Sequence, residues 1–456
     1  VLTCSAIGSN ISRFFRISRK NAITLLACGA AGAIAGVFKA PIAGVLFVFE
    51  VLMIDLTMSV ATPLLLSALT SALLSYFFFF FFLQFYYKVD TLFELSKIPA
   101  FVLLVIISAF MALYFLRINR WVSSKFSKYK RSTKIILGGS ILGLLVYIFP
   151  PLFGEGYSAL TSLLNNDVDV MFENSFFHPY VDNELTFLMV LVAIVFFKAI
   201  ATAVTCSSGG VGGTFAPSLF LGGFVGFFVA RIVNLSGLIY VAESNFALVG
   251  MAAVMAGVMH SPLTATFLIA EITGGYALFT PLLIATTIAY LVVKPLTKYS
   301  IYAAPLAAKG DLTTHNKDKN ALNYIDINKL IETNFVTLSP EAKLLDIVQA
   351  VKISSRSFFP VVDENQILKG VVVLDDVRSI LFDREKYDKV FIKDYMQYSE
   401  SFIVEINEPM EKIVEKFKIS DRYTLVVVEN GKYLGFVSRA NIFSAYQKYI
   451  REFSNE

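Results

Sequence analysis

The residues best suited to chemistry in this chain form a glycine-rich segment, GGTFAP, at residues 212–217 between two apolar runs. Glycine lets the backbone turn tightly, and the first turn of a helix leaves amide hydrogens without intrahelical partners. These amides and the positive end of the helix dipole attract a small anion. Because no full positive charge is involved, such a site can release a halide again, as conduction requires. Taken alone, the segment is equally typical of close helix packing through small residues.

The elements that must position this segment are those of a membrane protein. Of the 456 residues, 56% are hydrophobic and 16% are charged, and the mean hydropathy is +0.66, whereas soluble domains carry about 25% charged residues. Residues 1–305 hold 18 Lys/Arg and 12 Asp/Glu, and residues 306–456 hold 21 and 23. We therefore expect a membrane part followed by a soluble part. Neither part is basic enough to predict a nucleic-acid partner, and the three cysteines lack the spacing of a metal site.

Apolar stretches of about 20 residues, the length that crosses a bilayer, predict a multi-span α-helical membrane protein. They fall at 22–50, 59–87, 98–117, 133–152, 185–206, 214–241, 245–271 and 277–296. Several of them contain Gly, Pro or a lone charge, which favours broken helices surrounded by protein. Basic clusters at 13–20 and 117–134 predict cytoplasmic flanks, and the aromatic run at 77–82 predicts a lipid-facing surface.

An internal repeat relates two parts of the membrane region. Residues 27–50 (ACGAAGAIAGVFKAPIAGVLFVFE) match residues 248–271 (LVGMAAVMAGVMHSPLTATFLIAE) at a constant offset of 221. The matched pairs are Gly29 and Gly250, Gly36 and Gly257, Lys39 and His260, Pro41 and Pro262, and Glu50 and Glu271. Such duplication predicts a transporter or channel with its ion site near the midplane. The same offset places the partner of residues 207–217 before residue 1, so we expect the chain to be truncated at its N-terminus.

The charged tail contains a second, shorter repeat. Its predicted parts are a linker at 306–320 and two units at 321–386 and 387–456. At an offset of 65, Gly370 matches Gly435, Val373 matches Ser438, and Asp376 matches Asn441. Each unit has two β-branched strands, at 359–362 and 371–374 or at 425–428 and 434–437, and an amphipathic helix, at 344–353 or 410–419. We therefore predict two adjacent α/β units.

These motifs resemble those of the CLC family of chloride channels and proton/chloride exchangers across residues 1–305. GGTFAP resembles the G-x-F-x-P anion filter of the family, and FKAPIAGVLFVFE and MHSPLTATFLIAE resemble its repeated helices. The tail resembles the tandem CBS domains that many members carry there. The resemblance implies inverted repeats, a homodimer with one pore in each subunit, a place in the plasma or inner membrane, cytoplasmic CBS domains, chloride as the transported ion, and no enzymatic activity.

The resemblance also implies which residues hold the anion. The backbone amides of Thr214 and Phe215 would bind it, within a filter segment that also contains Gly213, Ala216 and Pro217. These amides are neutral donors, so the anion would be bound without being trapped.

One tyrosine of the family points its hydroxyl at the anion, and this role falls to Tyr299, with Tyr302 as the alternative one helical turn away. A phenol is a neutral donor suited to a halide, although a tyrosine at a helix end is also typical of an interfacial anchor. The serine loop and the gating glutamate of the family would precede Val1, so no gating residue is assigned.

Two acids, Glu50 and Glu271, lie in apolar surroundings where an unpaired carboxylate is costly. Proton-coupled members of the family carry an acid directly after the position of Glu50, where this chain has Val51. The resemblance therefore implies a passive chloride channel. A proton/chloride antiporter that uses Glu50 is the alternative, and a fluoride exporter of the same fold is disfavoured. Because the acid recurs in both repeats, we expect it to cap or orient a helix end.

Three basic or protonatable residues remain. Lys39 and His260 precede Ala-Pro and Ser-Pro at matching positions, which predicts corners between helices and favours this structural role over a vestibule that concentrates chloride. Lys198 lies about four helical turns before the filter. It can attract anions or extend to the membrane surface, and the sequence leaves both roles open.

The tail motif with Gly435, Ser438 and Asn441 resembles the CBS motif whose side chains contact the phosphate and ribose of a nucleotide. The first unit has Val373 in place of the hydroxyl, but Asp376 matches the ribose-binding acid. A single adenine-nucleotide site with Asp376, Ser438 and Asn441 is one interpretation, and a purely structural dimerisation module is the other. No cofactor is required.

Overall fold

The computed structural model describes residues 1–54, 57–78, 94, 97–165, 167, 171–172, 175, 177–180, 183–309, 322, 325–354 and 356–454. It divides into two compact units, residues 1–312 and 313–456, which are treated separately. Most of the aromatic run at 77–82 and most of the linker at 306–320 lie outside the described residues.

The first unit is helical. Its helices are α1 (Leu2–Phe14), α2 (Arg19–Phe38), α3 (Pro41–Glu50), α4 (Met58–Phe78), α5 (Ile98–Ser127), α6 (Arg131–Ile148), α7 (Tyr157–Leu164), α9 (Glu184–Ser208), α10 (Phe215–Leu235), α11 (Glu243–Met259), α12 (Pro262–Ile272), α13 (Phe279–Leu296) and α14 (Ala303–Lys309), with short 3-10 turns η2 (Pro150–Leu152) and η3 (His178–Tyr180). Within the described part of the chain, seven helices are long and apolar enough to cross a membrane, namely α2, α4, α5, α6, α9, α10 and α13. This architecture confirms the predicted multi-span helical fold.

Two of the predicted spans are each two helices joined by a sharp corner. The stretch at 22–50 divides into α2 and α3, and the stretch at 245–271 divides into α11 and α12. The corner residues Lys39 and His260 adopt left-handed backbone conformations, with φ of +53° and +57°. A proline follows two residues later and occupies the first position of the next helix, where its missing N–H costs nothing. The predicted corners are confirmed.

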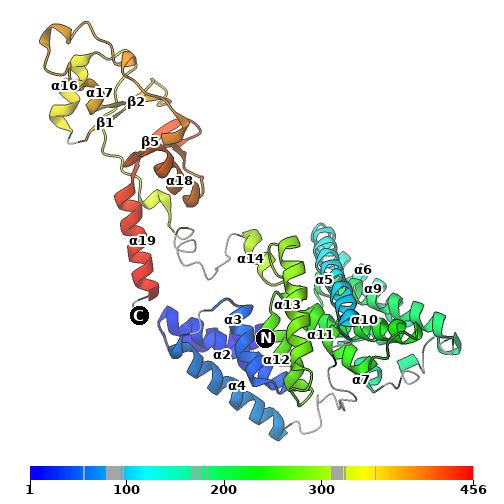
Figure 1. Cartoon of the computed structure of the whole chain (residues 1–456). Coiled ribbons are helices and arrows are strands. Elements are labelled where there is room, and N and C mark those ends of the chain that lie inside the picture. Colours follow the sequence, from blue (N-terminus) through cyan, green and yellow to red (C-terminus); the bar gives the residue numbers. More distant parts are fainter. Residues whose placement is uncertain are drawn as a thin grey trace. The chain divides into compact units, whose positions relative to one another are not determined.

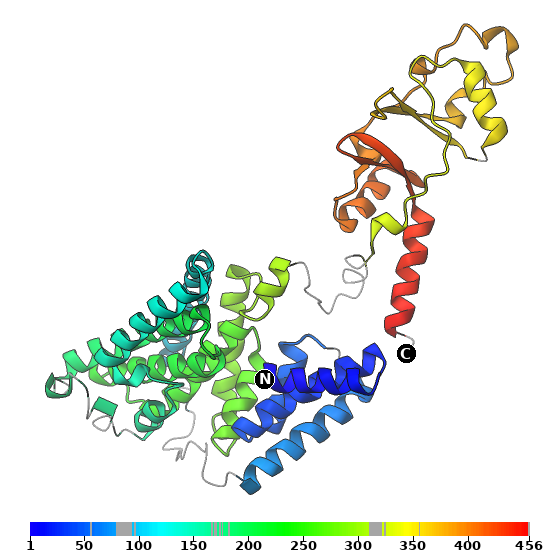
Figure 2. The ribbon, with the colours of Figure 1, turned by 180° about the vertical axis from the view of Figure 1, so that it is seen from behind.

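The helices of the two repeats correspond in order, α1 to α4 with α10 to α13. Figures 1 and 2 show α1–α4 as a blue group beside α12 and α13. In each repeat the first two helices cross in contact: a Cβ atom at Gly29 would collide with the backbone of Cys4, and one at Gly250 would collide with the backbone of Gly222. Glycine at both positions therefore lets the paired helices touch.

Helix α5 is longer than the stretch expected at 98–117, because it continues to Ser127. Charged residues do not end a helix, and its last turns keep an apolar stripe, since Ile118, Val122 and Phe126 recur at helical spacing. Val122 and Phe126 are buried against Ala203 and Val204 of α9. Helix α6 ends before η2 rather than at residue 152 because Pro150 and Pro151 cannot continue it.

The second unit contains two small sheets. Strand β1 (Phe358–Val362) pairs antiparallel with β2 (Leu368–Val373), and a second sheet has the order β3 (Ile403–Glu405), β4 (Thr424–Glu429), β5 (Lys432–Ser438). The helices are α16 (Leu344–Ile353), α17 (Leu374–Val377), α18 (Met410–Ser420) and α19 (Arg439–Ser454), with 3-10 turns η4 (Ile327–Lys329), η5 (Arg384–Lys386), η6 (Ile392–Asp394) and η7 (Glu400–Phe402).

The offset of 65 residues holds in this unit. Leu338 bridges Val361 in parallel, as Ile403 does with Val426. Strands β2 and β5 begin at Leu368 and Lys432, earlier than the expected 371 and 434, and Gly370 lies inside β2 rather than in front of it. The prediction of two adjacent α/β units is otherwise confirmed.

Candidate functional site

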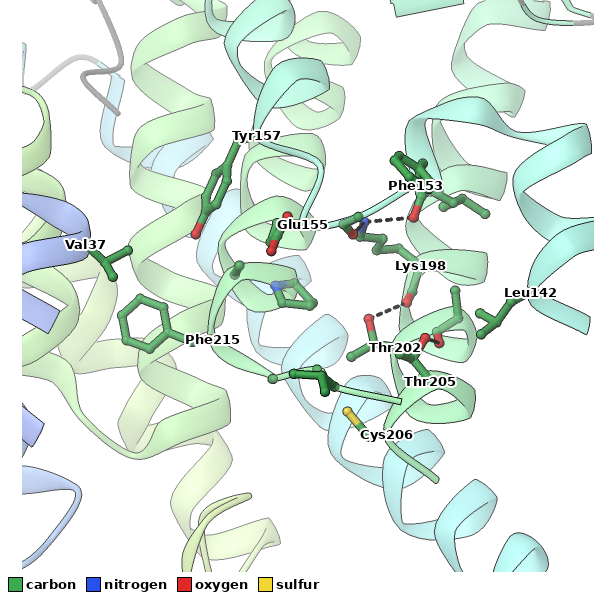
Figure 3. A pocket seen from close by; sticks show the side chains of 18 of the residues that line it. Val37, Leu142, Phe153, Glu155, Tyr157, Lys198, Thr202, Thr205, Cys206 and Phe215 are labelled. Carbon is green, nitrogen blue, oxygen red and sulfur yellow. Dashed lines mark hydrogen bonds between the residues drawn. The ribbon is translucent and has the colours of Figure 1, made fainter. Parts of the chain in front are cut away.

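A cavity of about 620 Å³ adjoins the N-terminus of α10. It is lined by α2, α6, α9, the loop around residues 152–157 and the glycine-rich segment. Figure 3 shows Glu155, Tyr157 and Phe215 on one side of this cavity, and Thr202, Thr205 and Cys206 on the other. No sequence pattern marks Glu155, Tyr157 or Cys206 as lining residues, because they come from helices and loops far apart in the chain.

The glycine-rich segment turns the chain from α9 into α10. Gly209 closes α9 in a left-handed conformation, with φ of +93°, and Thr214 is the N-cap of α10. The first donor inside the new helix is Ser218, whose N–H is bonded to the carbonyl oxygen of Thr214 at 3.2 Å. The amides of Phe215 and Ala216 lie in the first turn of the helix, where no intrahelical acceptor is available. Pro217, the next residue, has no N–H. Of the two amides predicted to bind an anion, those of Thr214 and Phe215, the Phe215 amide lies at this open end of the helix, and anion binding there stays a prediction.

Aromatic rings frame the start of α10. The ring of Phe215 stacks on that of Phe38 with centroids 4.9 Å apart, and lies 6.4 Å from that of Phe47. The ring of Phe47 is 6.3 Å from that of Tyr302, and the ring of Phe38 is 6.5 Å from that of Tyr157. The first repeat therefore contributes two rings to the start of α10 in the second, from the end of α2 and from α3.

Of the two candidate tyrosines, Tyr302 is the one with a described contact at the start of α10. The hydroxyl of Tyr302 lies beside the side chain of Thr214. The Ile301 amide donates to the carbonyl oxygen of Val258 at 3.3 Å, which ties this turn to the end of α11. Tyr299 instead has the Lys298 amine over its ring, 5.3 Å from the centroid.

Lys198 is 1% exposed and lies inside the protein. Its amine donates to the carbonyl oxygens of Leu152 and Gly154, at 3.1 and 2.9 Å, and lies 4.6 Å from the centroid of the Phe220 ring. It also interacts electrostatically with Glu155, and Figure 3 shows both side chains in the cavity. Extension of Lys198 to the membrane surface is therefore wrong, while attraction of anions stays a prediction.

Glu50 caps the N-terminus of α12, and Glu271 caps the N-terminus of α3. Oε1 and Oε2 of Glu50 accept from the amides of Leu263 and Thr264 at 3.0 and 2.7 Å, and the Thr264 hydroxyl also donates at 2.7 Å. Oε1 and Oε2 of Glu271 accept from the amides of Ile42 and Ala43 at 3.1 and 2.9 Å. Each acid ends one helix and holds the beginning of the other, so α3 and α12 run antiparallel. This is the expected helix-capping role.

The two corner residues contact matching positions. The Lys39 amine lies 4.7 Å from the centroid of the Tyr76 ring, and Lys39 is 6% exposed. Nε2 of His260 lies 3.1 Å from Oγ1 of Thr297. Since Tyr76 and Thr297 are also separated by the offset of 221, the corners belong to the repeat.

In the second unit, the candidate nucleotide residues have partners within the protein. Oδ2 of Asp376 accepts from Nε2 of Gln397 at 2.7 Å, and Nδ2 of Asn441 donates to Oε1 of Glu332 at 2.8 Å. The Asn441 amide donates to the Ser438 hydroxyl at 3.2 Å. A nucleotide that used these side chains would replace the first two contacts.

Comparisons with known proteins identify the family of each unit. The family model described as voltage gated chloride channel matches residues 1–294, and that of the CBS domain matches residues 326–383 and 392–448. Proteins called voltage-gated ClC-type chloride channel ClcB, from Escherichia coli strains UMN026 and SMS-3-5, are 28% and 30% identical over 285 residues. Each match covers 61% of this chain, and the chain spans 63% of the length of these relatives.

Solved structures show the same fold. A slow cyanobacterial Cl⁻/H⁺ antiporter is 24% identical with a TM-score of 0.55, and the match covers 67% of this chain and 69% of that one. A CLC-type fluoride/proton antiporter is 23% identical with a TM-score of 0.51, covering 66% and 70%. At this level of identity the likeness concerns the fold alone.

Proposed function

The chain belongs to the voltage-gated chloride channel family, and from that premise we propose that it is a channel that conducts chloride passively across the membrane. It is an integral membrane protein with two CBS domains at its C-terminus. The proposal extends to a homodimer with one pore in each subunit, and to CBS domains that lie in the cytoplasm and regulate opening.

The observation that carries the proposal is the side chain after Glu50. Val51 is the C-cap of α3, is 7% exposed, and packs in the apolar core. An aliphatic side chain cannot accept a proton at the place where proton-coupled members of the family have an acid. Glu50 itself accepts hydrogen bonds from two backbone amides and a hydroxyl, which favours a fixed carboxylate over a moving proton carrier.

We place the anion at the open amides of α10, where Thr214, Phe215 and Ala216 begin the helix. The hydroxyl of Tyr302 beside Thr214 supports this residue as the neutral donor, with Tyr299 as the alternative. The cavity next to Phe215 supplies the approach, and the buried charge of Lys198 attracts chloride into it.

A proton/chloride antiporter is the second candidate. It is favoured by the titratable side chains of Glu155 and Tyr157, which line the cavity beside the filter. In that case protons would move through these groups or through Glu50, and chloride would enter by the same path.

One experiment separates the two candidates. The protein is reconstituted in liposomes with a chloride gradient, and external chloride and external pH are recorded together, with and without a proton ionophore. Chloride loss without a pH change supports the channel. Proton uptake in fixed proportion to chloride supports the antiporter, and Glu50→Gln and Glu155→Gln would then identify the proton route. Absence of any chloride flux contradicts both.

The CBS pair is proposed to bind one adenine nucleotide with Asp376, Ser438 and Asn441. The proximity of the Asn441 amide and the Ser438 hydroxyl supports a joint contact to a ligand in the second unit. ATP and AMP binding to the protein would be measured by calorimetry, and Ser438→Ala or Asn441→Ala should weaken it. Undiminished binding by both variants would contradict this assignment of the site, and absence of binding by the unaltered protein would leave dimerisation as the role of the pair.

A further inference from the structure

Helix α3 is held at its beginning by a carboxylate from the other repeat. It has only 10 residues and starts with Pro41, and the amides of Ile42 and Ala43 are bonded to Glu271. Ala43 is fully buried. Buried amides that lose their acceptor cost about 1–3 kcal/mol each, so Glu271 fixes where this helix begins.

The same helix touches the anion filter one turn later. Phe47 lies four residues after Ala43, about 6 Å along the helix axis. Its side chain is 2% exposed, and its ring lies 6.4 Å from that of Phe215 and 6.3 Å from that of Tyr302. Because a short helix moves as a rigid body, a shift at its first turn displaces the Phe47 ring.

The opposite cap holds the beginning of α12, which carries no ring at the equivalent position. Glu50 holds the beginning of α12 through the Leu263 and Thr264 amides. The position in α12 equivalent to Phe47 is Leu268, and the aromatic ring of α12, Phe267, packs against Phe279 with centroids 5.3 Å apart. The two acids are thus structurally equivalent, but Glu271 is the one that holds the beginning of the helix that carries Phe47.

We propose that Glu271 is a positioning residue for anion selectivity, which sets the place of Phe47 against Phe215 and Tyr302 through the beginning of α3. The inference rests on the proposed function. Glu271 contacts no anion; it acts through the backbone amides of a helix contributed by the other repeat. Anion selectivity would therefore depend partly on Phe47, which lies outside the filter segment and in the other repeat.

The test compares matched variants in liposomes, with the ratio of chloride to nitrate efflux as the readout. Glu271→Gln removes one charge and weakens the two amide bonds at the beginning of α3. Glu243→Gln is the control, because it removes one carboxylate charge whose partner is Arg231 and not α3. We expect Glu271→Gln to change the ratio by about two- to tenfold, within the usual size of such coupling, and Glu243→Gln to leave the ratio at the wild-type value whatever its effect on the absolute rate. Glu271→Asp, which keeps the charge but is one methylene shorter, serves the same test if the first variant is not recovered folded.

A double variant tests the route. Phe47→Leu should change the ratio as well, and Glu271→Gln combined with Phe47→Leu should give the ratio of Phe47→Leu alone, because residues that act through one contact are not additive. An unchanged ratio in Glu271→Gln, an equal change in Glu243→Gln, or additive effects in the double variant would each overturn the inference while chloride flux persists. Absence of anion flux in the wild type overturns the proposed function and this inference with it.

Discussion

The side-chain ammonium of Lys198 donates to the carbonyl oxygen of Gly154 at 2.9 Å, which joins the middle of α9 to the loop that precedes α7. A second bond runs to the carbonyl oxygen of Leu152 at 3.1 Å. A lone cation in an apolar helix is therefore satisfied by backbone acceptors, as buried charges require. Its position also fixes the loop that carries Glu155 into the cavity.

Replacing Lys198 with Met should remove both bonds and the charge beside the cavity. We expect a loss of stability of about 1–3 kcal/mol, because the carbonyl group of buried Leu152 loses its donor. We also expect a several-fold fall in chloride efflux, because the local attraction of anions is lost. Thermal unfolding and liposome flux would measure the two effects. Lys125→Met, at an exposed site on α5, is the control and should change neither.

The two tyrosines after α13 should differ in their effect on anion binding. Tyr302→Phe removes the hydroxyl that lies beside Thr214, and chloride binding should weaken by about fivefold, the equivalent of one neutral hydrogen bond of about 1 kcal/mol. Tyr299→Phe should leave binding unchanged. Calorimetric titration with chloride would decide the matter, and the reverse order of effects would assign the role to Tyr299.

The thiol of Cys206 should report on the cavity. Cys206 is exposed and lines it, opposite Phe215 in Figure 3. A positively charged methanethiosulfonate reagent should attach there and reduce chloride efflux, because the added group occupies the approach to the filter. Cys206→Ser should abolish the inhibition. Inhibition that persists in this variant would point to Cys4 or Cys28 and contradict the assignment of the cavity as the chloride path.

The stability of the turn between β1 and β2 should depend on pH. Oδ1 of Asp363 accepts from the amides of Asn365 and Ile367, both at 2.9 Å, and Oδ2 pairs with Lys369 at 3.1 Å. The Ile367 amide above all lowers the pKa of Asp363. A lowered pKa in the folded state gives stability that is present above the unfolded pKa of about 3.9 and is lost as the pH falls through the lower folded value.

Asp363→Ala should therefore speed amide hydrogen exchange at Ile367 relative to the wild type at pH 7, and the difference should vanish at strongly acidic pH. Asp383→Ala is the control, since Asp383 accepts from Glu385 in another turn and should leave Ile367 unchanged. A difference that persists in acid would show that the side chain, and not its charge, holds the turn.

The sequence predicted the parts of the fold that follow from periodicity and repetition. Apolar length identified the spans, and the offset of 221 paired the helices around Gly29 and Gly250 correctly. It could not place Phe38 and Phe47 on Phe215, because aromatic residues in apolar helices are common and only the crossing of the two repeats brings these rings together. A search for rings near the repeat corners would have found Phe38.

The parts of the candidate site that depend on local sequence could be predicted, and the parts that depend on contacts between distant segments could not. The start of α10 at Phe215 follows from local chemistry, namely glycine before it and Pro217 in its first turn. The choice between Tyr299 and Tyr302 does not, since both lie in one short turn and their directions depend on how Ile301 binds to α11. Lys198 shows the same limit, because its acceptors lie 46 and 44 residues earlier in the chain.

The reciprocal carboxylate caps also bear on how the chain is made. The acceptor for the Ala43 amide is Glu271, which the ribosome adds 228 residues later. At about 5–20 residues per second, this interval is on the order of ten to fifty seconds. During it the newly inserted α3 has exposed amides at its beginning that lipid cannot satisfy. Until the second repeat has been translated, these amides must therefore be hydrated or covered by another protein. The first repeat reaches its final structure only after the second has been made.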